Sequence, residues 1–555
     1  MTIMTAVERK LIAISDGSEA PVRKPSEIIS ERRSKELIIA FAGPIGSGIN
    51  SVKTSLETIL SNAGYDVKNI KISDYIRDCI SGGLLRKAEI HTAGAERYIQ
   101  LQDAGNELRK IQSDFLAEHA IRRIAEIRTE RIGSTVADTI DAVPDRTAYI
   151  IDQLKHHEEV ALLRAVYGNL FYLFGVFSTS PRREGRLKAE GIEPNRISEL
   201  IERDRRQKDR FGQQLDKALQ LADFFVRNDH SNVEALEKQL KRFADLIHGA
   251  NGITPTREEY GMYAAYASGL RSACLSRQVG ASIMNLDGAI ISTGRNDVPK
   301  PGGGLYGPEC ESNDARCVKQ EEAICHNDRR KLMLAKEVKD VIRKGLSKHF
   351  KQIKEERNEK FAVLDELDIP LISEKLASDA YEETRLGGLI EFSRSIHAEM
   401  DAIVSLALKG GGGTKDAVLF TYTFPCHNCA RHIVAAGIKT VYFLEPYEKS
   451  LALELHSDAI SIDGVGEALE DDAESRRVRF LHFQGVAPRQ YLNMFSPAGE
   501  RKESSTGKAV KINFRDADKK VPEYLDDYRQ YEKKVVEHLV KVISDLKDKG
   551  LSSPT

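Results

Sequence analysis

The pattern of apolar and polar residues predicts two successive α/β regions. A continuous apolar run at 36–42 is typical of a strand that is buried on both faces of a parallel sheet. Helical periodicity follows this run at 52–63. Further short apolar runs predict strands at 65–67, 148–152, 170–177 and 224–227. Because these strands alternate with charged helices, we expect a parallel α/β sheet over residues 36–248.

A turn-rich segment at 249–255 separates the first region from a second α/β pattern. Helices are expected at 258–276, 331–362 and 429–436, and strands at 280–285, 289–293, 417–422 and 441–444. The sequence therefore predicts four parts, which are a lead-in (1–35), a first domain (36–248), a second domain (249–500) and a charged helical tail (501–555).

Composition and charge narrow the class of protein. The chain has 555 residues, which exceeds a single hydrophobic core, and its formal net charge of −2 gives no global reason for tight polynucleotide binding. No apolar run reaches the roughly 18 residues that span a bilayer, and the N-terminus lacks the features of a signal peptide. We expect a cytoplasmic protein without a membrane segment. Six of the seven cysteines lie between Cys274 and Cys429, which indicates metal binding or catalysis.

Four residues of the second domain fit the H-x-E…P-C-x-x-C signature of zinc deaminases, namely His397, Glu399, Cys426 and Cys429. The histidine and the two cysteines supply three zinc ligands. A zinc ion so held keeps its fourth position for water and lowers the pKa of that water towards about 7. Glu399 would take the proton of this water and pass it to the substrate. A purely structural zinc site is the alternative, but it would want a fourth protein ligand and would not need Glu399.

Four further cysteines are candidates for a second, structural zinc site. Cys274, Cys310, Cys317 and Cys325, with His326, could tie the irregular segment 299–330 to the helix expected at 258–276. Reduced, partly buried thiols are the alternative.

The segments around this signature resemble the deoxycytidylate deaminase family of the cytidine deaminase superfamily. The resemblance is carried by 271–281 and by the turn 294–299, although the turn has Arg295 and Asp297 where the family usually has tyrosine and glycine. It implies an αβα sandwich for the second domain and a substrate that is a deoxycytidine nucleotide. Asn296 would then bind the sugar and base, while Ser272 and Arg277 would approach the phosphate. The resemblance also places Cys274 and Cys310 where some members hold a structural zinc.

The first domain contains a glycine-rich loop between its first strand and first helix. Such a loop has the shape of a P-loop, whose backbone N–H groups cradle phosphate, but Ile49 and Asn50 replace the usual lysine and hydroxyl residue. Together with the strand-end aspartate, this domain resembles the P-loop nucleotide kinases. We expect binding of a regulatory nucleotide with weak or absent phosphoryl transfer. The candidate nucleotide-binding residues are Gly43, Gly46, Ser47, Gly48, Ile49, Asn50 and Asp152.

The combination of the two domains, together with residues 445–452, resembles the bacterial anti-phage dCTP deaminases. The resemblance implies hydrolysis of dCTP, and of dCMP, to the uracil nucleotides and ammonia, with depletion of deoxycytidine nucleotides during infection. It also implies a homo-oligomer, such as a hexamer, and for some members an inhibitory small RNA. The competing interpretations are a housekeeping dCMP deaminase, a deaminase of tRNA or single-stranded DNA, and a nucleotide-binding regulator with an inactive deaminase fold.

Overall fold

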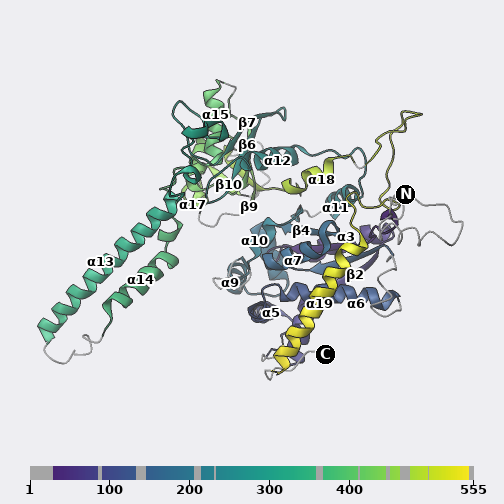
Figure 1. Ribbon diagram of the computed structural model, residues 1–555, viewed down its shortest axis with the longest axis horizontal. Coiled ribbons are helices and arrows are strands. Elements are labelled where there is room, and N and C mark those ends of the chain that lie inside the picture. Colours follow the sequence, from purple (N-terminus) through teal and green to yellow (C-terminus); the bar gives the residue numbers. More distant parts are fainter. Residues whose placement is uncertain are drawn as a thin grey trace, which may run out of the picture.

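A computed structural model describes most of the chain. The described residues are 29–85, 90–132, 145–205, 214–229, 233–357, 367–410, 413–445, 450–462, 476–497 and 499–548. Several predicted segments lie outside them in whole or in part, namely 1–28 of the lead-in, 358–362 of the charged helix, 446–449 of the segment resembling the anti-phage enzymes, and 549–555 of the tail. Figure 1 shows the described residues as two α/β bodies that lie side by side. No helix among these residues combines the length and the apolar character needed to cross a bilayer.

The first body is built on a sheet with the strand order β12-β5-β4-β1-β3-β2. Its five strands from the N-terminal region pair in parallel, as expected, and β12 is an antiparallel edge strand. The strands are β1 (Leu37–Ala42), β2 (Asp66–Lys71), β3 (Thr147–Asp152), β4 (Phe171–Phe177), β5 (Phe224–Arg227) and β12 (Gly485–Val486).

Helices cover both faces of this sheet because successive residues of its strands point to opposite sides. Along β1, Ile38 and Ala40 join a core with residues of α6 (Phe115–Ile132), α7 (His157–Tyr167) and α19 (Leu525–Asp548). Leu37 and Ile39 join a second core with residues of α3 (Ile49–Asn62) and α11 (Val233–Ile247). The uninterrupted apolar run therefore reflects burial on both faces.

The second body is an αβα sandwich on a sheet with the order β10-β11-β9-β8-β6-β7. Helix α12 (Arg257–Gly269) packs on one face, and α15 (Ala398–Leu408) and α16 (His427–Ala435) pack on the other. The strands are β6 (Gly280–Met284), β7 (Ile290–Arg295), β8 (Val418–Thr423), β9 (Thr440–Glu445), β10 (Ile460–Ile462) and β11 (Val478–His482).

The helix expected at 258–276 ends earlier than predicted, at Gly269. Gly280 explains this end, because a Cβ atom there would lie 1.9 Å from the carbonyl oxygen of Ala265. The start of β6 thus packs directly against the last turn of α12, and the chain must turn between them. Residues 270–279 consequently form a loop, and this loop reaches the functional site.

A long helical hairpin extends from the second body. It consists of α13 (His326–Arg357) and α14 (Ile369–Glu383), which pack against each other, and Figure 1 shows both helices projecting away from the two sheets. The charged helix predicted at 331–362 is confirmed within the described residues, although it begins five residues earlier than expected. Helix α14 was not predicted.

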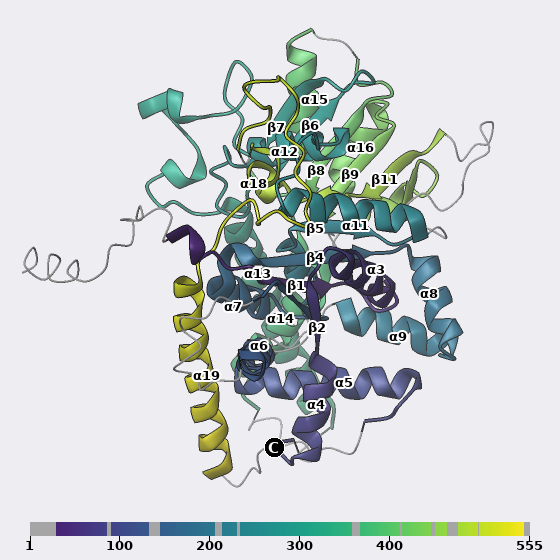
Figure 2. The same cartoon turned by 90° about the vertical axis from the view of Figure 1, so that its right-hand side faces the viewer.

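The chain returns to the first body after β11, so the predicted boundary at residue 500 needs correction. Strand β12 pairs with β5, and α19 packs against α6; Figure 2 shows α19 beside α6. Aromatic side chains join the two bodies at this return: the ring of His482 stacks on Phe177 with centroids 4.9 Å apart, and Phe483 meets Phe225 edge to face at 6.0 Å. The second body is therefore flanked on both sides by chain that belongs to the first sheet.

A buried ionic cluster fixes α19 to the first sheet. The guanidinium of Arg128 donates two hydrogen bonds to Glu36, at 2.8 and 3.0 Å, and two to Glu532. The side chains of all three residues are at most 6% exposed. Burial raises the pKa of Glu36, but the charge and hydrogen bonds of Arg128 outweigh burial and hold this pKa below its usual range.

Removing the cation of this cluster should destabilise the first body. Arg128→Ala leaves two carboxylates buried without a countercharge, and we expect a loss of about 3–5 kcal/mol in the free energy of unfolding. The measurement is urea denaturation followed by circular dichroism. Arg123→Ala is the matched control, because Arg123 lies on the same helix and pairs with partly exposed glutamates; its cost should be about 0–1 kcal/mol. Equal losses for the two variants would contradict the role given to Arg128.

Candidate metal centre and substrate cavity

Two helix N-termini bring the three predicted metal ligands together. His397 is the N-cap residue of α15, Cys426 is the N-cap residue of α16, and Cys429 lies in the first turn of α16. The Nδ1 atom of His397 lies 3.3 Å from the Sγ atom of each cysteine. The ligand atoms of the three residues all lie within 4.8 Å of one another. One imidazole and two thiols at this spacing fit a zinc ion with an open fourth position.

The local charges favour the thiolate form of Cys426, whereas the contact with Cys426 raises the pKa of His397 to about 8 and raises the pKa of Cys429 above its usual value. A hydrogen bond with the Cys429 thiol, together with one from the His397 imidazole, lowers the pKa of Cys426 to about 4 despite desolvation. The N-terminus of α16 adds the positive end of a helix dipole beside this sulfur. A thiolate at neutral pH is the form in which cysteine binds zinc.

Glu399 lies beside the ligand group but is not part of it. Its side chain is 4% exposed, and its two oxygens accept hydrogen bonds from Thr421 Oγ1 at 3.3 Å and from Cys429 Sγ at 3.4 Å. Burial raises the pKa of this carboxyl above its usual range. A carboxyl group with a raised pKa takes up and releases a proton near neutral pH more readily than an ordinary glutamate, which suits a general acid and base.

A cavity of about 200 Å³ opens onto this group. Its lining includes His397, Glu399 and Cys426 on one side and residues of the 270–279 loop on the other. Asn296 and Arg277, two of the predicted substrate ligands, also line it. The structure therefore brings two of the three candidate metal ligands, the Glu399 carboxyl and two substrate candidates to one cavity, while Cys429 is not part of its lining.

The third candidate, Ser272, is placed differently from the expectation. Its hydroxyl is buried, donates to the carbonyl oxygen of Asn296 at 2.5 Å and accepts from the N–H of Cys274 at 3.2 Å. Ser272 is not among the residues that line the cavity. Its hydroxyl instead holds the turn that presents Asn296, because both of its hydrogen bonds are to backbone atoms of this region.

Arg277 is held at the cavity by a buried carboxylate. Its guanidinium forms an ion pair with Glu445, the last residue of β9, and contacts Thr423 Oγ1 at 3.4 Å. The Arg277 side chain is 47% exposed and that of Glu445 is 6% exposed. One end of the guanidinium is thus fixed while the rest of the side chain remains accessible, an arrangement that suits contact with a substrate phosphate.

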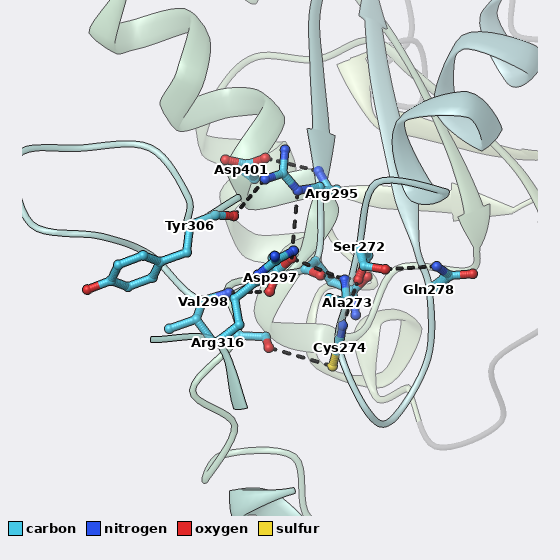
Figure 3. A network of polar contacts seen from close by, with 12 residues as sticks. Ser272, Ala273, Cys274, Gln278, Arg295, Asp297, Val298, Tyr306, Arg316 and Asp401 are labelled. Carbon is cyan, nitrogen blue, oxygen red and sulfur yellow. Dashed lines mark hydrogen bonds and ion pairs between the residues drawn. The ribbon is translucent and has the colours of Figure 1, made fainter. Parts of the chain in front are cut away.

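The two residues that depart from the family pattern in the 294–299 turn form an ion pair. Asp297 is buried, and its Oδ2 atom lies 3.8 Å from Arg295 Nε and 3.8 Å from Arg316 Nη1. Its carboxylate also accepts the backbone N–H groups of Ala273 at 3.2 Å and Val298 at 2.9 Å. Figure 3 shows these contacts converging on Asp297.

This network ties the 299–330 segment to the turn at Asn296. Arg316 comes from that segment, and Arg295 donates to the carbonyl oxygen of Tyr306 at 2.8 Å, while its own N–H is accepted by Asp401 of α15 at 2.9 Å (Figure 3). Sequence reasoning missed this role, because it treated the departures from the family turn only as a change in the base pocket. Charged residues at both changed positions were the available signal.

The four cysteines proposed for a second zinc are not gathered in the structure. Within the described residues, the group formed by His397, Cys426 and Cys429 is the only one of three or more metal-binding side chains at ligand spacing. Cys274 accepts a hydrogen bond from Ser395 Oγ at 3.6 Å, and Cys317 lies 4.0 Å from Arg394 Nη1. Three of the four, with His326, line the substrate cavity instead, while Cys310 does not.

The candidate nucleotide-binding residues of the first body also lie together. The glycine-rich loop follows β1, and its residues Gly46, Ser47 and Gly48 share a second cavity with Asn50 and Asp152, whereas the predicted Gly43 is not part of the lining. Ile49 is 3% exposed and packs into the core with α3, so it occupies the lysine position of the loop as a structural residue. Lys53, which the sequence places out of register, forms an ion pair with Asp152 at 3.1 Å.

Comparison with known proteins supports the interpretation of the second body. The sequence model of the cytidine and deoxycytidylate deaminase zinc-binding region matches residues 255–445. ComE operon protein 2 of Bacillus subtilis is 45% identical over 56 residues, which cover 10% of this chain and 29% of that protein. The deoxycytidylate deaminase of Enterobacteria phage T2 is 27% identical over 186 residues, covering 34% of this chain and 78% of that enzyme.

The match of the sequence model shows that a cytidine and deoxycytidylate deaminase domain is present in the chain, and the zinc that its family binds fits the described His/Cys/Cys group. Among solved structures, the dCMP deaminase of cyanophage S-TIM5 in complex with dCMP and dUMP shares 15% identity, with 42% of this chain and 99% of that chain covered and a TM-score of 0.22.

The zinc content of the protein should correspond to this single ligand group. We expect about one zinc ion per chain by elemental analysis, since three protein ligands suffice for a catalytic site. Cys429→Ser should lower the zinc content severalfold, because it removes a thiolate that bridges α16 to the metal. Cys310→Ser is the matched comparison and should leave zinc content unchanged. Two zinc ions per chain, with one lost in Cys310→Ser, would instead establish the second site.

Proposed function

We propose that this protein is a zinc-dependent deaminase that converts dCTP, and also dCMP, to the corresponding uracil nucleotide and ammonia. The observation that carries the proposal is the buried Glu399 beside the His397, Cys426 and Cys429 group at one cavity. A structural zinc site would have no use for an enclosed substrate cavity with a carboxyl group at its metal. The matched relatives named as deoxycytidylate deaminases support the nucleotide class.

The residues of the chain account for binding and proton transfer in this reaction. His397, Cys426 and Cys429 would hold the zinc ion, which would activate water as the nucleophile for the ring carbon that carries the amine. Glu399 takes one proton from this water and delivers it to the adjacent ring nitrogen. It then takes the second proton from the new hydroxyl group and passes it to the amine, so that ammonia leaves as the carbonyl forms. In this proposal Asn296 contacts the sugar and base and Arg277 contacts the phosphate, and their place in the cavity lining supports these roles. The carboxamide of Asn296 is held in place by the N–H of Val279 and the carbonyl oxygen of Arg277, each at 2.7 Å. The cavity walls limit the access of other nucleophiles.

The first body supplies regulation in this proposal and does not transfer phosphate. A kinase of the P-loop type needs a lysine and a magnesium ion at the transferred phosphate. Here Ile49 is buried in the core, and the ammonium group of Lys53 neutralises Asp152, the strand-end aspartate of the kinase-like pattern. We further propose that the protein acts in the cytoplasm as an oligomer and depletes deoxycytidine nucleotides during phage infection. An inhibitory small RNA is part of the same proposal only through the family resemblance.

Replacement of the carboxyl group should separate chemistry from metal binding. In Glu399→Ala we expect deamination to fall about a hundredfold or more, because proton transfer is lost. Zinc content and unfolding midpoint should stay near wild type. Uracil products are followed by chromatography after incubation with dCTP, dCMP, CTP and cytidine. Glu374→Ala, an exposed carboxylate on α14, is the control.

The same assay of uracil products distinguishes the proposed activity from the competing ones. Turnover of dCMP alone would favour the housekeeping enzyme, and turnover of cytidines within an oligonucleotide would favour a polynucleotide deaminase. In infected cells, wild type should lower the dCTP pool and phage yield, whereas Glu399→Ala should do neither. Near wild-type turnover by Glu399→Ala would overturn the assignment of the catalytic residue.

Phosphoryl transfer by the first body should be undetectable. Incubation of the full chain with labelled ATP and dCMP, or another nucleoside monophosphate, should give no diphosphate product above the background without enzyme, because Ile49 replaces the loop lysine that stabilises the transferred phosphate. Glu399→Ala is used in this assay so that dCMP is not consumed by deamination. Product formation at the rates of about 1–100 s⁻¹ typical of kinases would refute the regulatory role.

A further inference from the structure

A second enclosed cavity lies in the first body, at the start of α3. Its volume is about 240 Å³, close to the 200 Å³ of the deaminase cavity, so it can hold a ligand of similar size. It is lined by the glycine-rich loop at 45–48, by residues of α4 (Ile72–Ser81) and α5 (Gly94–Ile111), and by the end of β3. The deaminase reaction makes no use of this cavity.

The loop end of the cavity already binds an anionic oxygen. The backbone N–H of Ile45 donates to a carboxylate oxygen of Asp204 at 2.6 Å, and the other oxygen of Asp204 pairs with Lys155 at 2.7 Å. Asp204 and Lys155 both line the cavity. Because a loop N–H and an ammonium group hold one anion here, the chemistry of this end suits phosphate oxygens.

Further positive charge is directed at the same end. Arg186 of α8 (Ser180–Ala189) lines the cavity, and its hydrogen bonds within the described residues go to the carbonyl oxygens of Gly46 and Asn228 and to the hydroxyl of Ser178. None of these three acceptors carries a charge, and the nearby carboxylate of Asp229 is itself paired with Arg227, so it balances the charge of the guanidinium only in part. The hydroxyl of Ser47, which is 1% exposed, has no hydrogen-bond partner in the described part of the chain.

Gln102 of α5 provides an independent sign of a ligand. Its side chain is 6% exposed and lines the cavity, yet its carbonyl oxygen Oε1 has no hydrogen-bond partner among the described residues. A buried polar atom without a partner is unfavourable, and such atoms in folded proteins are normally paired. A carboxamide offers a donor and an acceptor side by side, which is the pattern that the hydrogen-bonding edge of a nucleobase complements.

The site needs no divalent cation to neutralise Asp152. That carboxylate lines the cavity, and the ammonium group of Lys53 lies 3.1 Å from it. The side chains of Lys53 and Asp152 are 10% and 21% exposed, so the pair is screened little by solvent. A ligand can therefore approach the loop without bringing a metal ion to this position.

We propose that this cavity binds a nucleoside phosphate, with its phosphate on the glycine-rich loop and Arg186, its base on Gln102, and no requirement for magnesium. The proposal rests on the regulatory role given above to the first body and specifies the ligand and the residue that recognises it. Gln102 is the specificity-determining residue, because the phosphate end alone does not distinguish a nucleotide from an inorganic polyphosphate.

The test compares Gln102→Leu with Gln100→Leu, both in the Glu399→Ala background of the full chain. Leucine fills a similar volume without an unpaired oxygen, so Gln102→Leu should fold with an unfolding midpoint at or above that of its parent. Gln100 lies on the same helix, is not part of the cavity lining and serves as the matched control. Calorimetric titrations with dCTP, dTTP, dATP and tripolyphosphate are made with and without magnesium chloride.

We expect at least one nucleotide to lose about tenfold or more in affinity on Gln102→Leu, which corresponds to the loss of about one hydrogen bond to the base. Tripolyphosphate should bind more weakly than that nucleotide and be unaffected by the change, and Gln100→Leu should bind like the parent. Equal affinity of Gln102→Leu and its parent for every nucleotide, or nucleotide binding no tighter than that of tripolyphosphate, would overturn the proposal. Strict dependence on magnesium would overturn the role given to Lys53.

The deaminase assay keeps the two proposals apart. dCTP that binds the catalytic cavity should do so equally in the Gln102→Leu and Gln100→Leu variants. Only the difference in affinity between these variants therefore reports on the first body. Uracil production by the chain with Glu399 intact tests the proposed deaminase activity separately. If no uracil product forms but Gln102→Leu still weakens nucleotide binding, the deaminase proposal alone is contradicted. If uracil product forms but Gln102→Leu leaves nucleotide binding unchanged, the nucleotide site alone is contradicted.

Discussion

The buried guanidinium of Arg128 determines how the two ends of the described chain meet. It lies between Glu36, which precedes β1, and Glu532 in α19. The guanidinium and each of the two carboxylates would be costly to bury alone, but together they neutralise one another. Tyrosine hydroxyls complete the cluster, with Tyr149 and Tyr528 bonded to Glu36. Because β1 runs directly into the glycine-rich loop, the position of α19 and the position of that loop depend on the same set of contacts.

The two cavities use one physical device for different chemistry. At the metal centre, the N-termini of α15 and α16 favour negative charge on the ligands. At the first-body cavity, the backbone N–H of Ile45 in the loop before α3 already holds a carboxylate, and the proposed ligand places phosphate oxygens on the same loop. The difference between them lies in what surrounds the helix ends: thiols and a buried carboxyl group in one, and basic side chains with a carboxamide in the other.

Sequence patterns predicted the parts of the fold and site that depend on local chemistry. The strands of the first sheet agree with the short apolar runs, because burial on both faces leaves a continuous signal. The metal ligands were predictable since their spacing along the chain is fixed by two helix starts. Arg128, Asp297 and Gln102 were not predicted, because the significance of each depends on partners or a cavity formed by segments distant in sequence. The overlong helix prediction at 270–276 failed for a similar reason, as only the packing of Gly280 against α12 forces the turn.

The return of the chain to β12 turns the second body into an insertion held at both ends. A domain joined by one linker can rotate about it, whereas two covalent connections and the stacked rings of Phe177 and His482 remove most of that rotational freedom. The ring centroids of His482 and Phe443 lie 4.2 Å apart. Phe443 belongs to β9, the strand that ends at Glu445, the ion-pair partner of Arg277. The two bodies are therefore constrained to shift together, and an evolutionary exchange of either one would have to preserve both attachment points.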